Sequence, residues 1–316
     1  MPEWLVEEGI GEHRAVLVEG GEILAARLDW PGPLKAGLVE DAVLISRAAG
    51  SPRGTARFAN GEEALVDGLP RDANEGAKLR LIVKRTALDD GFRRKLAQAR
   101  PTSDPIRPAP TLAQSLGARI VPCFDGWDEL WSEASQGSVE FAGGALRVEQ
   151  TTALIAIDID GTLPPKSLAL ASVPVIARTI RRFDLAGSIV IDFPTLEAKA
   201  DRRAIDAALE TELADWPHER TAMNGFGLVQ LVARRERPSL LELLGMWPDA
   251  TARLLLRRAE RVREPGALLL TALPQVRRAT LPDWGLELAR RTGREIRWEI
   301  DKSLAPQACF AQAVPL

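Results

Sequence analysis

The sequence is short of the residues from which many zinc and disulfide sites are built. It has only two cysteines, Cys123 and Cys309, among 316 residues. Neither belongs to a C-x-x-C pair, so we expect no zinc knuckle. The first residues show no basic segment followed by an apolar one, which predicts no signal peptide. Both thiols are therefore expected to be reduced in a cytoplasmic protein.

Long apolar runs and a surplus of positive charge are also missing, and histidine is rare. No stretch reaches the ~18–20 apolar residues of a membrane helix, so we expect no membrane contact. The formal net charge of −3 does not by itself indicate nucleic-acid binding. His13 and His218 are the only histidines. We do not expect them to meet as an acid–base pair, because one lies near a predicted strand start and the other in a predicted loop.

The composition, with 46% hydrophobic and 27% charged residues, is typical of globular proteins. The chain is long enough to form two or three hydrophobic cores. Arginine far outnumbers lysine and occurs in clusters, one of which contains Arg234, Arg235 and Arg237. Arginine suits phosphate through its bidentate fork. An arginine-rich segment is more often a solvated surface, so phosphate binding by this cluster is one of two interpretations.

Two apolar segments, residues 152–160 and 188–193, each lead into aspartates. A segment with a helical pattern lies between them, which predicts a right-handed parallel βαβ unit. Adjacent parallel strands would bring Asp158 and Asp192 to one edge of the sheet, where open α/β sheets carry their sites. Asp160 would share the face of Asp158, because side chains alternate along a strand.

Three carboxylates at one edge repel one another unless a cation neutralises them, and an oxygen-only set suits Mg²⁺. The alternative is structural, because an acid at the end of a strand is often only a turn or helix cap. Acids on two neighbouring strands, one of them within Asp-x-Asp, strengthen the case for a site.

The remaining chain shows two smaller units. Several short strands over residues 35–84 predict a small barrel of the OB type, a fold often used on nucleic acid. Phe58 in this segment is either a base-stacking residue or part of the barrel core. Residues 85–115 predict a charged helix and then a proline-rich linker. After residue 248, helices and strands alternate in an α+β pattern.

The sequence Asp-Ile-Asp-Gly-Thr at 158–162 matches the first motif of haloacid-dehalogenase-type phosphatases. That resemblance implies a nucleophilic Asp158, an acid Asp160 and bound Mg²⁺. The rest of the pattern fits poorly, because no late acidic pair follows an apolar strand downstream.

A wider set of motifs resembles the catalytic domain of the ribonuclease E/G family. It comprises residues 149–158 (Glu-Gln-Thr-Thr-Ala-Leu-Ile-Ala-Ile-Asp), 184–193 (Asp-Leu-Ala-Gly-Ser-Ile-Val-Ile-Asp-Phe) and 226–240, which begin Phe-Gly-Leu-Val-Gln-Leu. Their order and spacing agree with the family, apart from a shortened loop after the first acid. Residues 11–19 also resemble its opening strand.

The resemblance implies a magnesium-dependent endoribonuclease that cleaves single-stranded RNA. The family's two metal-binding aspartates correspond to Asp158 and Asp192, and an assisting asparagine corresponds to Asp160. The implied fold is multidomain α/β, with an RNase H-like and DNase I-like catalytic core. The expected parts are the N-terminal strands of the RNase H-like part (1–34), an inserted OB-type RNA-binding barrel (35–84), and a linker with a sensor remnant and the rest of the RNase H-like part (85–145). The DNase I-like catalytic domain (146–245) and a small α+β C-terminal domain (246–316) follow.

Several departures from the family pattern suggest a reduced member. The zinc-linking cysteines expected soon after residue 240 are absent, so a homodimer would have to form without zinc. Arg85 and Thr86 resemble the family's sensor of RNA 5′ ends only superficially, and we do not assign them that role. Polar residues of the helix between the acids are replaced around Ala169 and Val173. A non-catalytic RNA-binding protein on the same scaffold is therefore the second hypothesis.

Overall fold

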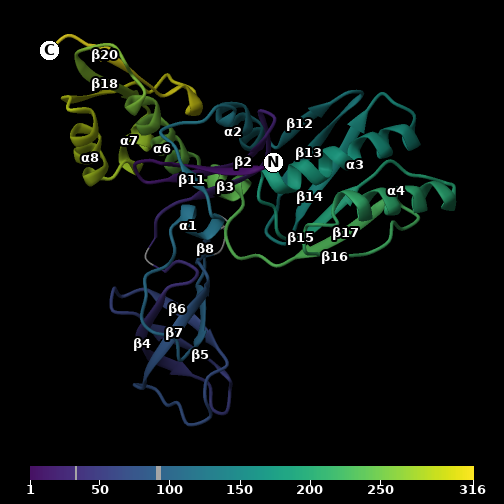
Figure 1. Cartoon of the computed structure of the whole chain (residues 1–316), viewed down its shortest axis with the longest axis horizontal. Helices are drawn as coiled ribbons and strands as arrows, with labels where there is room; N and C mark the ends of the chain where they lie inside the picture. The colour runs from purple at the N-terminus through teal and green to yellow at the C-terminus, as the bar shows by residue number, and fades with distance from the viewer. Residues whose placement is uncertain (33, 90–93) are drawn as a thin grey trace.

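The computed structural model describes residues 1–32, 34–89 and 94–316. It confirms the predicted mixed α/β architecture (Figure 1). An N-terminal sheet lies at the centre of the view, a barrel hangs below it, a larger α/β unit lies to the right and the C-terminal unit lies to the left. In the described part of the chain, no helix is long and apolar enough to cross a membrane.

The central sheet has four strands in the order β11-β1-β2-β3. The antiparallel strands are β1 (Glu3–Glu8), β2 (His13–Glu19) and β3 (Glu22–Asp29), and the short β11 (Arg119–Ile120) pairs parallel to β1. The short helix α1 (Leu112–Leu116) contacts β1 and β2. The barrel, the larger α/β unit and the C-terminal unit all adjoin this sheet (Figure 1).

The barrel is closed and has five strands in the order β10-β6-β5-β4-β7. They are β4 (Val39–Arg47), β5 (Arg53–Arg57), β6 (Glu63–Asp67), β7 (Lys78–Arg85) and β10 (Ala97–Pro101). Alternating side chains fill its interior and form a hydrophobic core of their own. The closed barrel confirms the predicted barrel-like segment and fits an OB-type insertion.

The charged helix predicted after residue 85 is not found in the described residues. Instead β8 (Leu88–Asp89) pairs with β9 (Arg94–Lys95), and β10 follows directly. Residues 90–93 of the predicted helix lie outside the described residues. β10 pairs with both β6 and β7, so these ladders override the local preference for helix.

The larger sheet has six strands in the order β12-β13-β14-β15-β17-β16. The strands are β12 (Ser138–Phe141), β13 (Gly144–Gln150), β14 (Ile155–Gly161), β15 (Gly187–Asp192), β16 (Glu219–Arg220) and β17 (Leu228–Ala233). β14 and β15 are parallel and are joined by α3 (Pro165–Arg182), as the sequence predicted. The other neighbouring strands are antiparallel.

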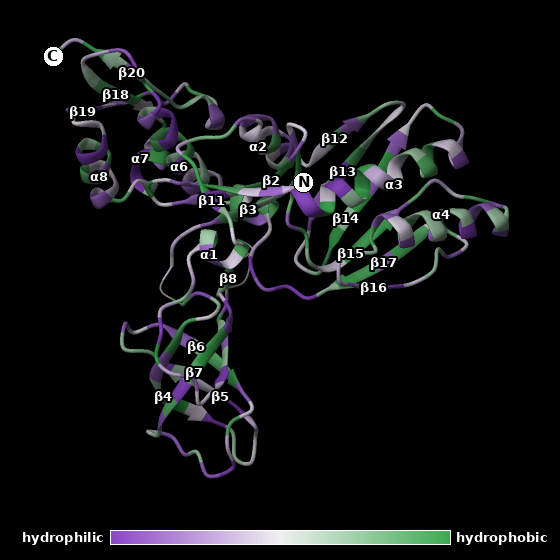
Figure 2. Cartoon of the chain, viewed as in Figure 1, coloured by the Kyte–Doolittle hydropathy of each residue, from purple (hydrophilic) through white to green (hydrophobic). Residues whose placement is uncertain are grey.

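Helices cover only one face of this sheet. Ile155, Ile157 and Ile159 of β14 are buried, and they pack in one core with α3, with α4 (Lys199–Glu212) and with α2 (Trp127–Gln136). In Figure 2 the central strands of this sheet are largely green, with polar breaks. The alternate residues of β14 face the uncovered side, where Asp158 and Asp160 are exposed.

The C-terminal unit consists of helices on a three-stranded sheet in the order β19-β18-β20. Its elements are α5 (Leu240–Gly245), α6 (Trp247–Glu260), β18 (Ala267–Ala272), α7 (Pro274–Ala279), α8 (Pro282–Thr292), β19 (Ile296–Ile300), the 3-10 turn η1 (Pro306–Ala308) and β20 (Phe310–Val314). Buried side chains of α6, β18 and α8 form its core.

A buried ionic junction ties α6 to the central sheet. Glu7 of β1 is 1% exposed, and its carboxylate forms an ion pair with the Arg261 guanidinium at 2.7 Å. The Arg257 guanidinium lies 3.8 Å from the same carboxylate oxygen. Arg257 is itself buried and passes over Gly9, where a Cβ would lie 1.8 Å from its guanidinium. Only glycine at this position leaves room for that arginine. The junction therefore depends on charge pairing between units distant in sequence.

Candidate functional site

Asp158 and Asp192 are direct neighbours across the parallel strands β14 and β15. The ladder pairs Ile157 with Ile191 and Asp158 with Asp192. Partners in neighbouring strands are about 4.8 Å apart and project to the same face of the sheet. Both carboxylates are exposed, whereas Ile157 and Ile191 are 0% exposed beneath them. Two acids thus stand side by side on rigid strands, and we call the end of the sheet that carries Asp158 and Asp192 the acidic edge.

Asp160 lies two residues after Asp158, so both side chains project from the same face of the strand, and Asp160 is also exposed. The strand β14 continues past Asp158 as far as Gly161, whereas β15 ends at Asp192. Asp160 therefore projects past the end of β15, at the rim of the acidic pair.

The electrostatics of this edge favour a cation. Burial raises the pKa of the Asp158 carboxyl, and the neighbouring negative charges of Asp160, Asp192 and Glu149 raise it further. A backbone hydrogen bond from Ile159 opposes the rise. Like charges disfavour ionisation unless something neutralises them. A divalent cation between the strands would relieve this repulsion.

Mg²⁺ usually takes one or two carboxylates from a protein and keeps several waters or phosphate oxygens. Asp158 and Asp192 supply two hard oxygen donors on adjacent strands. In residues 1–32, 34–89 and 94–316, no group of three or more His, Cys, Asp or Glu side chains is arranged to hold a metal ion. Asp158 and Asp192, which together form the candidate magnesium platform, match the one or two carboxylates that Mg²⁺ usually takes from a protein.

Asp160→Asn separates two roles for this residue. If Asp160 contributes negative charge to the platform, the variant should need several-fold more Mg²⁺ for half-maximal RNA cleavage, yet cleave measurably at high Mg²⁺. The measurement is a magnesium titration of cleavage rate. The conservative variant Asp160→Glu, which keeps the charge, is the control. An unchanged titration for Asp160→Asn would remove this residue from the site.

Arg147 is a neighbour of the acids that the sequence interpretation missed. It lies on β13 directly across from Asp158, and its side chain is exposed. Within the described residues, its guanidinium makes no hydrogen bond or ion pair. A cation beside a metal platform can receive a phosphate. Only the strand register reveals this position, because nothing in the local sequence marks it.

Phe58, for which the sequence left base stacking and a place in the barrel core as alternatives, is 3% exposed and lies in the barrel core. Its backbone closes a turn with Glu62 and Gly61 just after β5. A ring enclosed in a core has no face for a base, so this burial favours the core interpretation over an RNA contact.

The arginine cluster lies at the other end of the sheet. β17 runs antiparallel to β15, so Leu228 pairs with Asp192 while Ala233 pairs with Gly187. The cluster follows Ala233 and is thus about 20 Å from the acids. Arg235 pairs with the buried Glu242, Arg237 pairs with Asp184 at 2.8 Å, and Arg234 lies 3.5 Å from Glu236. The pairs of Arg235 and Arg237 tie this segment to α5 and to the turn before β15, and none of the three arginines joins the acidic edge.

The two histidines lie in different sheets, as expected. His13 begins β2 in the central sheet, and burial lowers its pKa. His218 stacks on Trp216 at 5.1 Å, beside β16 of the larger sheet. The structure thus brings no imidazole pair to one site. Both cysteines are free thiols, with Cys123 exposed and Cys309 buried.

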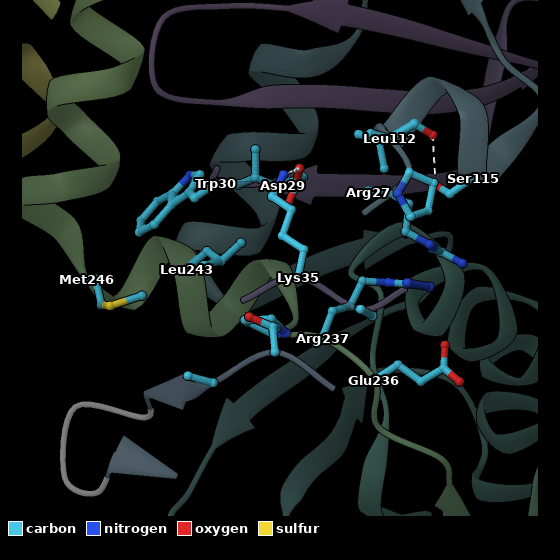
Figure 3. A pocket seen from close by; sticks show the side chains of 16 residues that line it. Arg27, Asp29, Trp30, Lys35, Leu112, Ser115, Glu236, Arg237, Leu243 and Met246 are labelled. Carbon is cyan, nitrogen blue, oxygen red and sulfur yellow. Dashed lines mark hydrogen bonds and ion pairs between the residues drawn. The ribbon is translucent and has the colours of Figure 1, made fainter. Parts of the chain in front are cut away.

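A cavity of about 300 Å³ lies away from the acids, where β3, the base of the barrel, α1 and α5 meet (Figure 3). Its cations are already paired: Arg27 with Asp184 at 3.2 Å, Lys35 with Asp29, and Arg237 with Asp184. Glu236 and Arg237, which follow the far end of β17, form part of the wall. The cavity is therefore separate from the edge that carries Asp158 and Asp192.

Comparison with known proteins gives a match at the acidic edge. The model of the ribonuclease E/G family matches residues 126–236, which include both aspartates and strands β12 to β17. Ribonuclease G of Escherichia coli (strain K12) is 31% identical over 140 residues, covering 40% of this chain and 28% of that protein. Ribonuclease E of Buchnera aphidicola is 34% identical over 113 residues, covering 32% of this chain and 12% of that protein.

A third relative, ribonuclease G of Salmonella typhimurium (strain SL1344), is 31% identical over 141 residues. The match covers 39% of this chain and 28% of that protein. The chain thus matches less than a third of the length of these relatives. The similarity is confined to part of the chain, and that part holds the paired acids.

Proposed function

Because this chain belongs to the ribonuclease E/G family through residues 126–236, we propose that it is a magnesium-dependent endoribonuclease that cleaves single-stranded RNA. The proposed site residues are Asp158 and Asp192 as magnesium ligands, with Asp160 at their rim. The observation that carries the proposal is the register of β14 and β15, which pairs the two aspartates within the segment that matches the family.

The chemistry follows from the residues at this edge. When bound, Mg²⁺ supplies a Lewis acid that neutralises non-bridging phosphate oxygens and lowers the pKa of a coordinated water. Asp158 and Asp192 would hold the ion at a fixed place, because buried isoleucines anchor both strands. Arg147, on the neighbouring strand, would add positive charge beside the phosphate. The face is uncovered by helices, which leaves an extended chain free to approach.

The barrel supports RNA as the substrate in a general way. A closed five-stranded barrel of this kind is a common platform for single-stranded nucleic acid. In Figure 1 it stands apart from the sheet that carries the acids and adjoins the central sheet. We propose a reduced family member located in the cytoplasm. Any homodimer would rest on packed surface, because the sequence has no C-x-x-C pair.

A non-catalytic RNA-binding protein is the second candidate. The replaced helix positions favour it, since Ala169 and Val173 are 0% exposed in the core and offer no polar group. The retained acids argue against it. The phosphatase alternative has less support, because the sequence after Asp-Ile-Asp-Gly-Thr lacks the late acidic pair that would supply its further metal ligands.

One assay separates the three candidates. Purified protein with Mg²⁺ is incubated with a mixed-sequence single-stranded RNA and, separately, with an aryl phosphate. An endoribonuclease converts the RNA to internal fragments and leaves the aryl phosphate intact. Binding without fragments would favour the RNA-binding protein, and release of phosphate from the aryl ester would favour the phosphatase. EDTA should abolish the cleavage, which tests the metal requirement.

A further inference from the structure

Phe226 is an aromatic side chain left in solvent beside the acidic edge. It is 80% exposed, and among the described large apolar side chains only the terminal Met1 and Leu316 are more exposed. A single exposed apolar residue is common and needs no special explanation. The loop that carries Phe226 is, however, fixed by hydrogen bonds and lies next to the strand that ends in Asp192.

The loop that carries Phe226 is held by its own side chains. The Asn224 carboxamide oxygen accepts hydrogen bonds from the backbone N–H of Phe226 at 2.9 Å and of Leu228 at 3.1 Å. The backbone N–H of Asn224 donates to the Leu228 carbonyl at 3.1 Å. Both ends of the turn are thus fixed to the start of β17. The exposed ring therefore sits on an ordered turn.

The same turn is fastened to the strand that ends in Asp192. The backbone N–H of Phe193 donates to the Gly227 carbonyl at 3.2 Å. Gly227 has φ +92, and a Cβ there would lie 2.4 Å from the Phe193 carbonyl oxygen. Only glycine permits this approach. The position of Phe226 is consequently coupled to that of the acid one residue before Phe193.

The turn that carries Phe226 adjoins the acidic edge. Leu228, the first residue of β17, pairs with Asp192, which pairs with Asp158. Two residues of chain span at most about 7 Å and neighbouring strands lie about 5 Å apart, so the backbone of Phe226 is within about 12 Å of that of Asp192. A base attached to a phosphate at the two acids is within reach of a ring at that distance.

We propose that Phe226 is a stacking platform for a nucleobase next to the scissile phosphate, and that it positions the RNA strand across Asp158 and Asp192. This proposal rests on the proposed function. An aromatic ring gives a face to any base, so it fixes the strand with little sequence preference. Phe58 of the barrel is buried, which leaves Phe226 as the exposed aromatic nearest the acids in the described residues.

The test uses the variants Phe226→Ala and Phe226→Tyr. The control is Phe310→Ala, which removes another exposed aromatic ring, in β20 of the C-terminal sheet. The first readout is binding of single-stranded RNA in EDTA, followed by fluorescence anisotropy, which does not need cleavage. The second is kcat/KM for an RNA with a mapped cleavage site. Phe226→Ala should weaken both by about tenfold, as loss of one base–aromatic stack does. Phe226→Tyr and Phe310→Ala should stay within about twofold of the parent.

A second measurement distinguishes stacking from a structural role. RNAs with one abasic nucleotide at successive positions around the cleavage site are compared on the parent and on Phe226→Ala. At the stacked position, base removal should slow the parent about tenfold and add little to Phe226→Ala, because both changes remove the same contact. Additive losses at every position would overturn the proposal. Equal binding and cleavage by Phe226→Ala and the parent would also overturn it.

Two further outcomes are informative. Absence of cleavage by the parent would refute the proposed function, whereas the anisotropy comparison would still decide whether Phe226 contacts RNA. If Phe226→Ala instead halves the mass seen by light scattering, the ring lies between two copies of the chain, and the stacking proposal is overturned.

Discussion

Asp158→Asn and Asp192→Asn are each expected to reduce RNA cleavage by about a hundredfold or more at saturating RNA and fixed Mg²⁺. Each change removes one of two negative ligands from the cation, and an amide oxygen binds Mg²⁺ more weakly than a carboxylate. The two residues are register partners on β14 and β15, so the loss should be similar for both. The measurement is the initial rate of fragment formation from one single-stranded RNA.

Both variants are expected to stay folded. The pKa of Asp158 is raised in the folded protein, first by burial and then by neighbouring carboxylates. A carboxyl with a raised folded pKa binds its proton more tightly in the folded state. Ionisation of Asp158 therefore lowers the stability of the metal-free protein when the pH is above its folded-state pKa. This loss of stability disappears as the pH falls below the pKa of an aspartate in the unfolded chain, about 3.9. Asn at this position should not lower the metal-free thermal midpoint at pH 7.

Magnesium gives a second readout of the same pair. An ion that binds only the folded state raises the thermal midpoint of the parent, and the rise should be smaller in both variants. Glu219→Gln is the matched control, because Glu219 is an exposed acid in the same sheet that pairs with Val232, away from the acids. Its cleavage and magnesium response should equal those of the parent. Parental cleavage by either Asp variant would show that the site lies elsewhere.

Glu7→Gln is expected to lower the free energy of unfolding by about 3 kcal/mol, because it leaves buried guanidinium charge without its carboxylate. Glu7 is 1% exposed and serves both Arg257 and Arg261. Glu260, which lies 3.7 Å from Arg257, can offset part of the loss. The change should separate the C-terminal unit from the central sheet earlier during unfolding. The measurement is the thermal or urea midpoint at pH 7.

The control is Glu3→Gln on the same strand. Glu3 pairs with Arg119 at 2.8 Å, but both side chains are at least half exposed. Exposed pairs contribute less than about 1 kcal/mol, so this variant should change the midpoint little. Equal shifts for Glu3→Gln and Glu7→Gln would show that burial does not set the strength of the junction.

The acidic edge was predictable from the sequence because its signals are local. Apolar runs ending in Asp158 and Asp192, with a helical segment between them, determine a parallel pair whose acids meet in register. The strand period places Asp160 on the face of Asp158 without any knowledge of the fold. The closed barrel also followed from the spacing of short strands and turns.

Other features depended on contacts between distant segments. Phe58 faces the barrel core, and the segment after residue 85 forms strands because β10 completes the barrel between β6 and β7. The cluster of Arg234, Arg235 and Arg237 lies far from the acids, because β17 runs antiparallel to β15. Local composition carries no information on strand direction or on which face a barrel buries.

The sequence by itself determined the paired acids, because strand period and helix connection are encoded within about 40 neighbouring residues. Only the tertiary structure decided which side chains surround them. Arg147 and Phe226 reach the acidic edge through the registers of β13 with β14 and of β15 with β17. Those registers are set by long-range packing of the buried face against α3 and α4, which no local pattern specifies.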